Sequence, residues 1–214
     1  MTEAVVTSSR RPTAPFFRLL GNALRGARRA GTCDCVAVET TPDAPCSRKL
    51  LIVGSPNVGK SVLFNRLTGR YVVVSNYPGT TVEVSRGRAR IGGESYEIID
   101  TPGMYSLRPV SDEERAGRAL MLAEKADLVV HVVDAKNLDR MLPFTLQLVE
   151  AGFPVVLAVN MMDEAGKLGL RLRLDLLSQK LGLPVVGTVA VKGHGLEELR
   201  NVIAEHAAAG AAAL

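Results

Sequence analysis

The sequence predicts an α/β fold in which a six-stranded, mainly parallel sheet carries helices on both of its faces. From residue 49 onward, apolar runs bounded by Gly, Pro and Asp alternate with segments of helical period, a pattern typical of βαβ units. A length of 214 residues suits one domain with a tail. With 47% hydrophobic and 22% charged residues, the chain has enough apolar surface for a sizeable core, and wholesale disorder is excluded.

The first half of the domain begins with a buried strand. Residues 49–53 are mostly apolar without alternation, which predicts a strand covered on both faces. A helix of period 3.6 follows over residues 60–67. Two further strands, 81–91 and 94–99, are separated by Gly92-Gly93, a pair typical of a tight hairpin turn.

The second half alternates helices and strands. Ser111 is a good N-cap for a helix over residues 112–123. The remaining strands are expected at residues 128–133, 155–159 and 185–189, and the remaining helices at residues 138–149, 175–181 and 195–207.

We divide the chain into three parts: an arm and cysteine-containing linker at residues 1–48, expected to be partly disordered, a folded domain at residues 49–208, and an alanine-rich tail at residues 209–214. Six arginines and one glutamate give residues 1–31 a net charge of +5, whereas the whole chain carries +4. Residues 32–214 therefore carry −1. Because the positive charge lies in the arm, we expect no nucleic acid to bind the folded domain.

Residues 13–31 predict a basic amphipathic helix, with apolar side chains on one side and four arginines on the other. Such a helix can lie on an anionic membrane surface, where apolar burial and arginine–phosphate attraction add. It can equally dock on its own domain or stay disordered, since Gly21 and Gly26 each cost about 1 kcal/mol in a helix. An arginine-rich organelle-targeting segment is a third interpretation.

No apolar run in the sequence reaches the ~18–20 residues needed to cross a bilayer, and the richest run is residues 153–162. Three cysteines, an odd number, and the lack of a cleavable secretory signal favour a reducing compartment. We therefore expect a cytoplasmic protein, placed at the inner face of the cell membrane if the arm binds lipid.

The cysteines and histidines do not form a complete metal-binding set. Zinc and iron–sulfur sites normally need four ligands, but only Cys33, Cys35 and Cys46 lie close together in the sequence. Free thiols are the preferred interpretation, and a metal site shared between molecules is the alternative. The histidines are isolated, and His131 lies in the middle of a predicted strand, where we expect a hydrogen-bonded core residue.

A phosphate-binding loop is predicted between the first strand and the first helix. The motif G-x-x-x-x-G-K-S is formed by Gly54, Ser55, Pro56, Asn57, Val58, Gly59, Lys60 and Ser61. Glycines let backbone N–H groups surround phosphates, the lysine reaches the terminal phosphates, and the serine hydroxyl can bind Mg²⁺. This pattern alone indicates a nucleotide but not which base it carries.

Three later motifs complete a guanine-nucleotide site. Asp100, Thr101, Pro102 and Gly103 follow a strand and bring a carboxylate near the metal, with a glycine amide near a third phosphate. The acceptor pair of Asp163, in Asn160, Met161, Met162 and Asp163, suits the two N–H donors of guanine, which adenine lacks. A loop with Gly79, Thr80, Thr81, Val82 and Glu83 can respond to the third phosphate, through Thr81 on Mg²⁺.

The segment from residue 49 to residue 208 resembles the G domain of the bacterial ferrous-iron transport protein B family, within the translation-factor-like GTPases. The resemblance is carried by VSNYPGTTVE at residues 74–83, DTPGMYSL at residues 100–107, and VVDA at residues 132–135 together with LQL at residues 146–148. It implies a Ras-like P-loop GTPase fold and slow hydrolysis of GTP to GDP with Mg²⁺, coupled to ferrous-iron uptake. It also places Ala190, Val191 and Lys192 in the last guanine-contacting loop, where backbone contact replaces the usual hydroxyl side chain.

Three residues bear on the implied mechanism. Met104 stands where Ras-type GTPases place a water-orienting glutamine, and a thioether cannot orient water, so no side-chain base is identified. Asn57 resembles the asparagine of potassium-stimulated members and is expected to help hold K⁺ beside the phosphates; the alternative is a structural asparagine that satisfies loop amides. Met161 replaces a lysine that packs along the guanine plane, which predicts micromolar affinity and rapid GDP release.

Three functions are weighed. The preferred one is a GTPase that serves ferrous-iron uptake through a separate membrane permease, because the sequence ends after the last helix of the G domain. An RNA- or ribosome-assembly GTPase shares these motifs but usually adds a basic RNA-binding domain. A nucleotide-sensing adaptor with negligible hydrolysis is the third.

Overall fold

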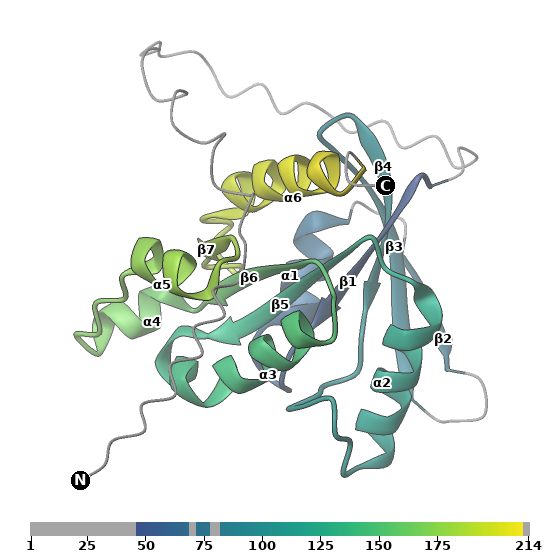
Figure 1. Ribbon diagram of the computed structural model, residues 1–214, viewed down its shortest axis with the longest axis horizontal. Helices are drawn as coiled ribbons and strands as arrows, with labels where there is room; N and C mark the ends of the chain where they lie inside the picture. The colour runs from purple at the N-terminus through teal and green to yellow at the C-terminus, as the bar shows by residue number, and fades with distance from the viewer. Residues whose placement is uncertain (1–45, 69–71, 78–81, 212–214) are drawn as a thin grey trace, which may run out of the picture. The chain divides into compact units, whose positions relative to one another are not determined.

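The protein is represented by a computed structural model that describes residues 46–68, 72–77 and 82–211 (Figure 1). The predicted arm, with its amphipathic segment at residues 13–31 and with Cys33 and Cys35, lies outside the described residues. The elements in chain order are β1 (Arg48–Val53), α1 (Lys60–Leu67), β2 (Val72–Asn76), β3 (Glu83–Ile91), β4 (Glu94–Asp100), α2 (Asp112–Glu124), β5 (Leu128–Asp134), a 3₁₀ turn η1 (Ala135–Asn137), α3 (Leu138–Glu150), β6 (Val155–Asn160), α4 (Met162–Lys167), α5 (Leu174–Leu181), β7 (Val185–Gly187) and α6 (Leu196–Ala211).

The strands form one sheet in the order β2-β3-β4-β1-β5-β6-β7. Neighbouring strands from β4 to β7 are parallel, whereas β3 runs antiparallel to both β2 and β4. The predicted mainly parallel α/β sheet is confirmed, and so is the hairpin at Gly92-Gly93. Since parallel strands end at the same edge, β1, β4, β5 and β6 all deliver their carboxyl ends to one side of the sheet.

Besides the short 3₁₀ turn η1, one strand and one α-helix were not predicted. The strand β2 is a seventh strand at the edge of the sheet, and all five of its residues are exposed. Because β2 buries neither face, its sequence carries no alternation of apolar and polar residues. The second missed element is α4, which is only six residues long.

Helices cover both faces of the sheet, as predicted (Figure 1). In β1, Leu50 and Ile52 belong to the apolar core that includes α1 and α6, whereas Leu51 and Val53 belong to the core that includes α2 and α3. All four side chains are fully buried, and each contributes roughly 1.5–3 kcal/mol relative to an exposed position. This two-sided burial explains why the strand has no alternating pattern.

Some element ends differ from the predicted ones. The strand β7 ends at Gly187, two residues early, because the backbone N–H of Val189 donates to His194 in the following loop at 3.0 Å. The helix α6 continues to Ala211 rather than ending at residue 207, as alanine has the highest helix propensity. Within the described ranges, no helix combines the length and apolar character that a bilayer span requires.

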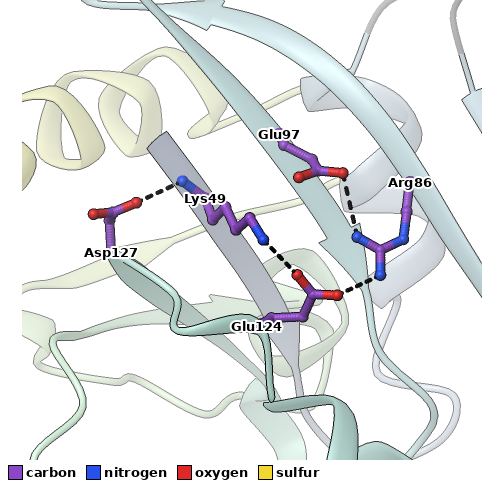
Figure 2. A network of polar contacts seen from close by, with 5 residues as sticks. All are labelled: Lys49, Arg86, Glu97, Glu124 and Asp127. Atoms are coloured by element: carbon purple, nitrogen blue, oxygen red, sulfur yellow. Dashed lines mark hydrogen bonds and ion pairs between the residues drawn. The ribbon is translucent and has the colours of Figure 1, made fainter. Parts of the chain in front are cut away.

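Charged side chains tie the last residue of α2 to strands β1 and β3 (Figure 2). Lys49 in β1 donates from Nζ to Glu124 at 2.7 Å, and its backbone N–H donates to Asp127 at 2.7 Å. Arg86 in β3 bonds both Glu124 and Glu97. These contacts hold the pKa of Glu124 below its usual value, the bond from Arg86 being the largest cause and burial opposing it. The last residue of α2 is thus held to β1 and β3.

Candidate functional site

The loop between β1 and α1 contains two glycines in positions closed to larger residues. Gly54 has a φ of 148° and Gly59 a φ of 90°, conformations that residues with a Cβ rarely adopt. A Cβ on Gly54 would lie 2.3 Å from the carbonyl oxygen of Val132, and one on Gly59 would lie 2.4 Å from Nδ2 of Asn160. The loop is therefore packed tightly against the strand ends behind it.

Lys60, the first residue of α1, is a buried cation at the base of this loop. Its side chain is 8% exposed, and Nζ donates to the carbonyl oxygen of Ser55 at 3.0 Å. Burial lowers the pKa of the ammonium group, while the charges of Asp100 and Glu113 act against that shift. A buried ammonium at a helix N-terminus, beside a turn of backbone amides, is suited to bind phosphate.

Asp100 ends β4 beside the first turn of α1. Its Oδ2 accepts a hydrogen bond from Ser61 Oγ at 2.7 Å, whereas its buried Oδ1 has no hydrogen-bond partner among the described residues. Burial raises the pKa of this carboxyl group, and the Ser61 bond and the charge of Lys60 oppose the rise. A hydroxyl and a carboxylate with a spare oxygen are the donor types that Mg²⁺ prefers, so this pair fits the predicted metal.

The residues after Asp100 are fixed against β1 and the loop of residues 54–59. Thr101 donates to the carbonyl oxygen of Ile52 from both its backbone N–H (3.1 Å) and its Oγ1 (3.0 Å). A Cβ on Gly103 would lie 2.6 Å from Cγ of Pro56, and the next backbone N–H, that of Met104, donates to Gly54 at 3.0 Å. This segment can therefore approach the loop only because residue 103 is glycine.

These residues enclose a cleft of about 260 Å³ at the carboxyl edge of the sheet. Its walls are Pro56, Lys60, Ser61, Glu83, Ser85, Asp100, Thr101, Pro102, Gly103 and Glu113. The structure thus brings together the predicted phosphate loop, the Asp100–Gly103 motif and Glu83. Gly79, Thr80 and Thr81 lie outside the described residues, while Tyr77 and Val82, on either side of them, are joined by a backbone hydrogen bond of 2.8 Å.

Met104 does not face the cleft. Its side chain is fully buried, and a Cβ on Gly117 of α2 would lie only 2.7 Å from its sulfur. Met104 is therefore a packing residue between the loop and α2.

The predicted base-binding residues lie at the ends of β6 and β7. Asn160 is 4% exposed, and its side chain bonds protein groups at both ends. Asp163 accepts a hydrogen bond from Lys192 at 2.7 Å, which holds the pKa of its carboxyl group below the usual value. The two predicted guanine-binding segments thus meet, through Asp163 and Lys192. Within the second segment, Ala190 is buried and Val191 is exposed.

Two cleft residues were not predicted from the sequence. Ser85 lies in β3, and Glu113 lies in the first turn of α2, where its Oε1 accepts a hydrogen bond from the backbone N–H of Gly103 at 3.2 Å. Acidic residues are common in the first turn of any helix, so no sequence signal distinguished Glu113 from its neighbours Asp112 and Glu114.

Two predictions concern residues outside the cleft. His131 is fully buried in β5, and its Nδ1 lies 3.0 Å from Oγ1 of Thr145, which confirms a hydrogen-bonded core histidine. Cys46 is a free cysteine that accepts a weak hydrogen bond from Ser95. Among the described residues, His, Cys, Asp and Glu form no group of three or more placed to hold a metal.

Comparison with known proteins identifies the family. The family model for ferrous iron transport protein B matches residues 48–203. The chain is 47% identical over 169 residues to the Fe(2+) transport protein A/Fe(2+) transporter FeoB fusion protein of Porphyromonas gingivalis, a match that covers 78% of this chain and 20% of that protein. The chain thus spans about a fifth of the length of the curated relatives it matches.

Solved structures give the same result. The G domain of the T. maritima FeoB iron transporter is 42% identical, with a TM-score of 0.70 over 75% of this chain and 98% of that one. The cytosolic domain of the same transporter in a GDP form is 42% identical, with a TM-score of 0.71 over 77% of this chain and 65% of that one. The fold is that of a Ras-like P-loop GTPase. This chain belongs to the ferrous iron transport protein B (FeoB) family, and it contains the family's G domain.

Proposed function

We propose that this chain binds GTP and GDP in the cleft between α1 and β4 and hydrolyses GTP slowly to GDP. The observation that carries the proposal is Lys60, a buried ammonium group held at the base of a glycine-bounded loop. Among the described residues, no carboxylate is hydrogen-bonded to this ammonium group, which makes its burial costly, and a bound phosphate chain would compensate its charge. The family relationship and the GDP form of a relative add support.

For the base, we propose that Asp163 accepts the two N–H donors of guanine. In the described structure this carboxylate bonds Lys192, so guanine would share or replace that partner. Asn160, Met161, Met162 and the loop of Ala190, Val191 and Lys192 complete the predicted base site. We propose micromolar affinity, since Met161 offers no cation beside the guanine plane.

For the metal ions, we propose that Ser61 and Thr81 bind Mg²⁺ and that Asp100 holds it through its outer shell. Bound Mg²⁺ would neutralise charge on the phosphates. Asn57, exposed and with a φ of 63°, is proposed to help bind K⁺, which would supply the positive charge that an arginine supplies in other GTPases. No side-chain base is proposed, because the thioether of Met104 cannot orient water by hydrogen bonding.

The decisive experiment measures binding of GDP and of a GTP analogue by titration, and GTP hydrolysis in KCl and in NaCl at matched ionic strength. We expect slow turnover that is several-fold faster in KCl and that disappears in Lys60→Ala. Lys180→Ala, which removes an exposed lysine of α5, should keep the wild-type rate. Binding of neither nucleotide would contradict the proposal as a whole, binding without hydrolysis would contradict the GTPase activity, and equal rates in the two salts would contradict the K⁺ site alone.

We also propose that nucleotide turnover serves ferrous-iron uptake through a membrane transport protein, as the names of the relatives suggest. A separate permease, a cytoplasmic location and a peripheral membrane contact through residues 13–31 stay predictions. Sedimentation of the whole chain and of a chain lacking residues 1–31 with anionic vesicles tests the membrane contact. Co-purification from solubilised membranes tests the permease.

A further inference from the structure

Glu113 is a carboxylate in the wall of the nucleotide cleft, on the second residue of α2. Its Oε1 accepts the backbone N–H of Gly103 at 3.2 Å. It lines the same cleft as Lys60 and Ser61, and its negative charge favours the ammonium form of Lys60, against the larger effect of burial. A negative charge therefore already occupies part of a site that must receive the phosphates.

The amide that Glu113 engages belongs to a tightly packed residue in the cleft wall. Gly103 packs so closely on Pro56 that a Cβ would lie 2.6 Å from its ring, and the following N–H is bonded to Gly54 at 3.0 Å. The donor of Gly103 is thus fixed relative to the phosphate loop. An anion that binds in the loop and extends toward Asp100 reaches the N–H of Gly103. It can accept this hydrogen bond only if it displaces the Glu113 carboxylate or shares the N–H with it.

The neighbouring Glu114 shows the difference between a structural carboxylate and one placed in a binding site. Glu114 is buried and accepts backbone N–H groups from Tyr105, Val110 and Ser111. Glu113 is exposed to the cleft, and its hydrogen bond joins α2 to Gly103. Loss of Glu113 therefore leaves the loop of residues 105–111 held by its neighbour.

We propose that Glu113 is an internal anion that competes with the third phosphate of GTP for the Gly103 amide, and so sets the preference of the site for diphosphate over triphosphate. The inference rests on the proposed function. A diphosphate is one anionic group shorter and leaves the Glu113–Gly103 bond in place. A triphosphate brings an additional negative charge toward the same donor, where like charges repel.

The experiment compares GDP with a non-hydrolysable GTP analogue by isothermal titration in Mg²⁺ buffer. Glu113→Gln keeps an acceptor oxygen but removes the charge, and Glu113→Ala removes both. In each variant we expect the ratio Kd(GDP)/Kd(GTP analogue) to rise about five- to tenfold, mainly through tighter triphosphate binding, as expected for removing one repulsive charge contact. A thermal melt without nucleotide should stay near that of the wild type.

Asp112→Asn is the matched control. It removes the same charge one residue earlier, where the carboxylate is exposed and pairs with Arg115 on the helix surface, and it should leave the ratio unchanged. An equal rise in Asp112→Asn would assign the effect to general charge at the helix start and overturn the role of Glu113. An unchanged ratio in the Glu113 variants, with the wild type binding both nucleotides, would overturn this inference alone. A wild type that binds neither nucleotide would overturn the proposed function.

Discussion

Asn160, the last residue of β6, donates from Nδ2 to the carbonyl oxygen of Val58 at 2.9 Å, although 102 residues separate the two in the chain. Its Oδ1 accepts two further bonds, from Thr188 Oγ1 at 3.1 Å and from the backbone N–H of Ala190 at 3.0 Å. One buried amide thus joins the phosphate loop, the end of β6 and the loop after β7. This side chain thus fixes the position of the predicted phosphate loop relative to the predicted guanine-binding loop.

Asn160→Ala should lower the free energy of unfolding by about 3 kcal/mol, because it leaves three buried polar groups without a partner. Urea denaturation followed by circular dichroism measures the loss. Asn201→Ala, at an exposed position of α6, should change stability by less than about 0.5 kcal/mol. Similar values for the two variants would show that the three bonds do not stabilise the fold.

Glu114→Gln should lower stability by about 2 kcal/mol, because charge-assisted bonds to three backbone amides are weakened. Those amides, that of Val110 first, hold the pKa of Glu114 below its ordinary value. Its stabilisation is therefore complete above pH 4.5 and declines as the pH falls through the lowered pKa. Hydrogen exchange should also speed up at Tyr105 and Val110, whereas Glu113→Gln should leave both amides protected.

Asp163→Asn should weaken GDP binding at least tenfold, because an amide cannot accept both N–H donors of the guanine edge. Binding of xanthosine diphosphate should improve instead, since xanthine presents a carbonyl where guanine has an amine. Competitive titration with a fluorescent nucleotide measures both affinities. Glu164→Gln, which alters the adjacent carboxylate paired with Lys136, should retain the guanine preference; its loss in both variants would count against Asp163 as the base acceptor.

The stability of the wild-type chain should fall in mild acid because of His131. Burial lowers the pKa of this imidazole to about 3, whereas its ordinary value is 6.5. Below about pH 6.5 the imidazole of His131 is protonated in the unfolded chain but stays neutral in the folded chain. The free energy of unfolding therefore falls as the pH is lowered to about 3. The loss between pH 7.5 and pH 5 should be about 2 kcal/mol.

The His131 contribution is measured by urea denaturation across that pH range. His131→Gln should flatten this part of the profile even if the variant is less stable overall. His194→Gln, at an exposed position, should keep the wild-type slope. A slope that is the same in all three proteins would rule out His131 as its source.

Much of the fold could be predicted because buried segments have recognisable patterns of apolar residues. Residues 50–53 are all apolar since both faces of β1 are covered there, and Ser111 with Glu114 forms the capping box at the start of α2. The strand β2 has no such pattern, because all of its residues are exposed and its position depends on pairing with β3. The continuation of α6 was missed because a run of alanines was interpreted as a fraying tail.

The site was predictable where one residue type is required by its surroundings. Gly54, Gly59 and Gly103 each lie where a Cβ would collide, and Lys60 and Asp100 stand at fixed positions relative to the strand ends. The place of Glu113 in the site was not predictable, since it depends on a hydrogen bond from a backbone amide ten residues earlier in the chain. The role of Asn160 as a tie between loops likewise depends on partners that only the folded sheet brings near.

The charge network at Glu124 has a mechanical consequence for the whole of α2. The helix is clamped at its last residue to β1 and β3 and at its first turn to the segment of residues 103–111. A rearrangement of that segment that carries the helix along must strain the contacts with Lys49 and Arg86 at the far end. Since the last residue of α2 is bonded to the sheet, the helix resists being shifted as a whole. Small movements in the cleft are therefore expected to be absorbed by the loop that precedes the helix.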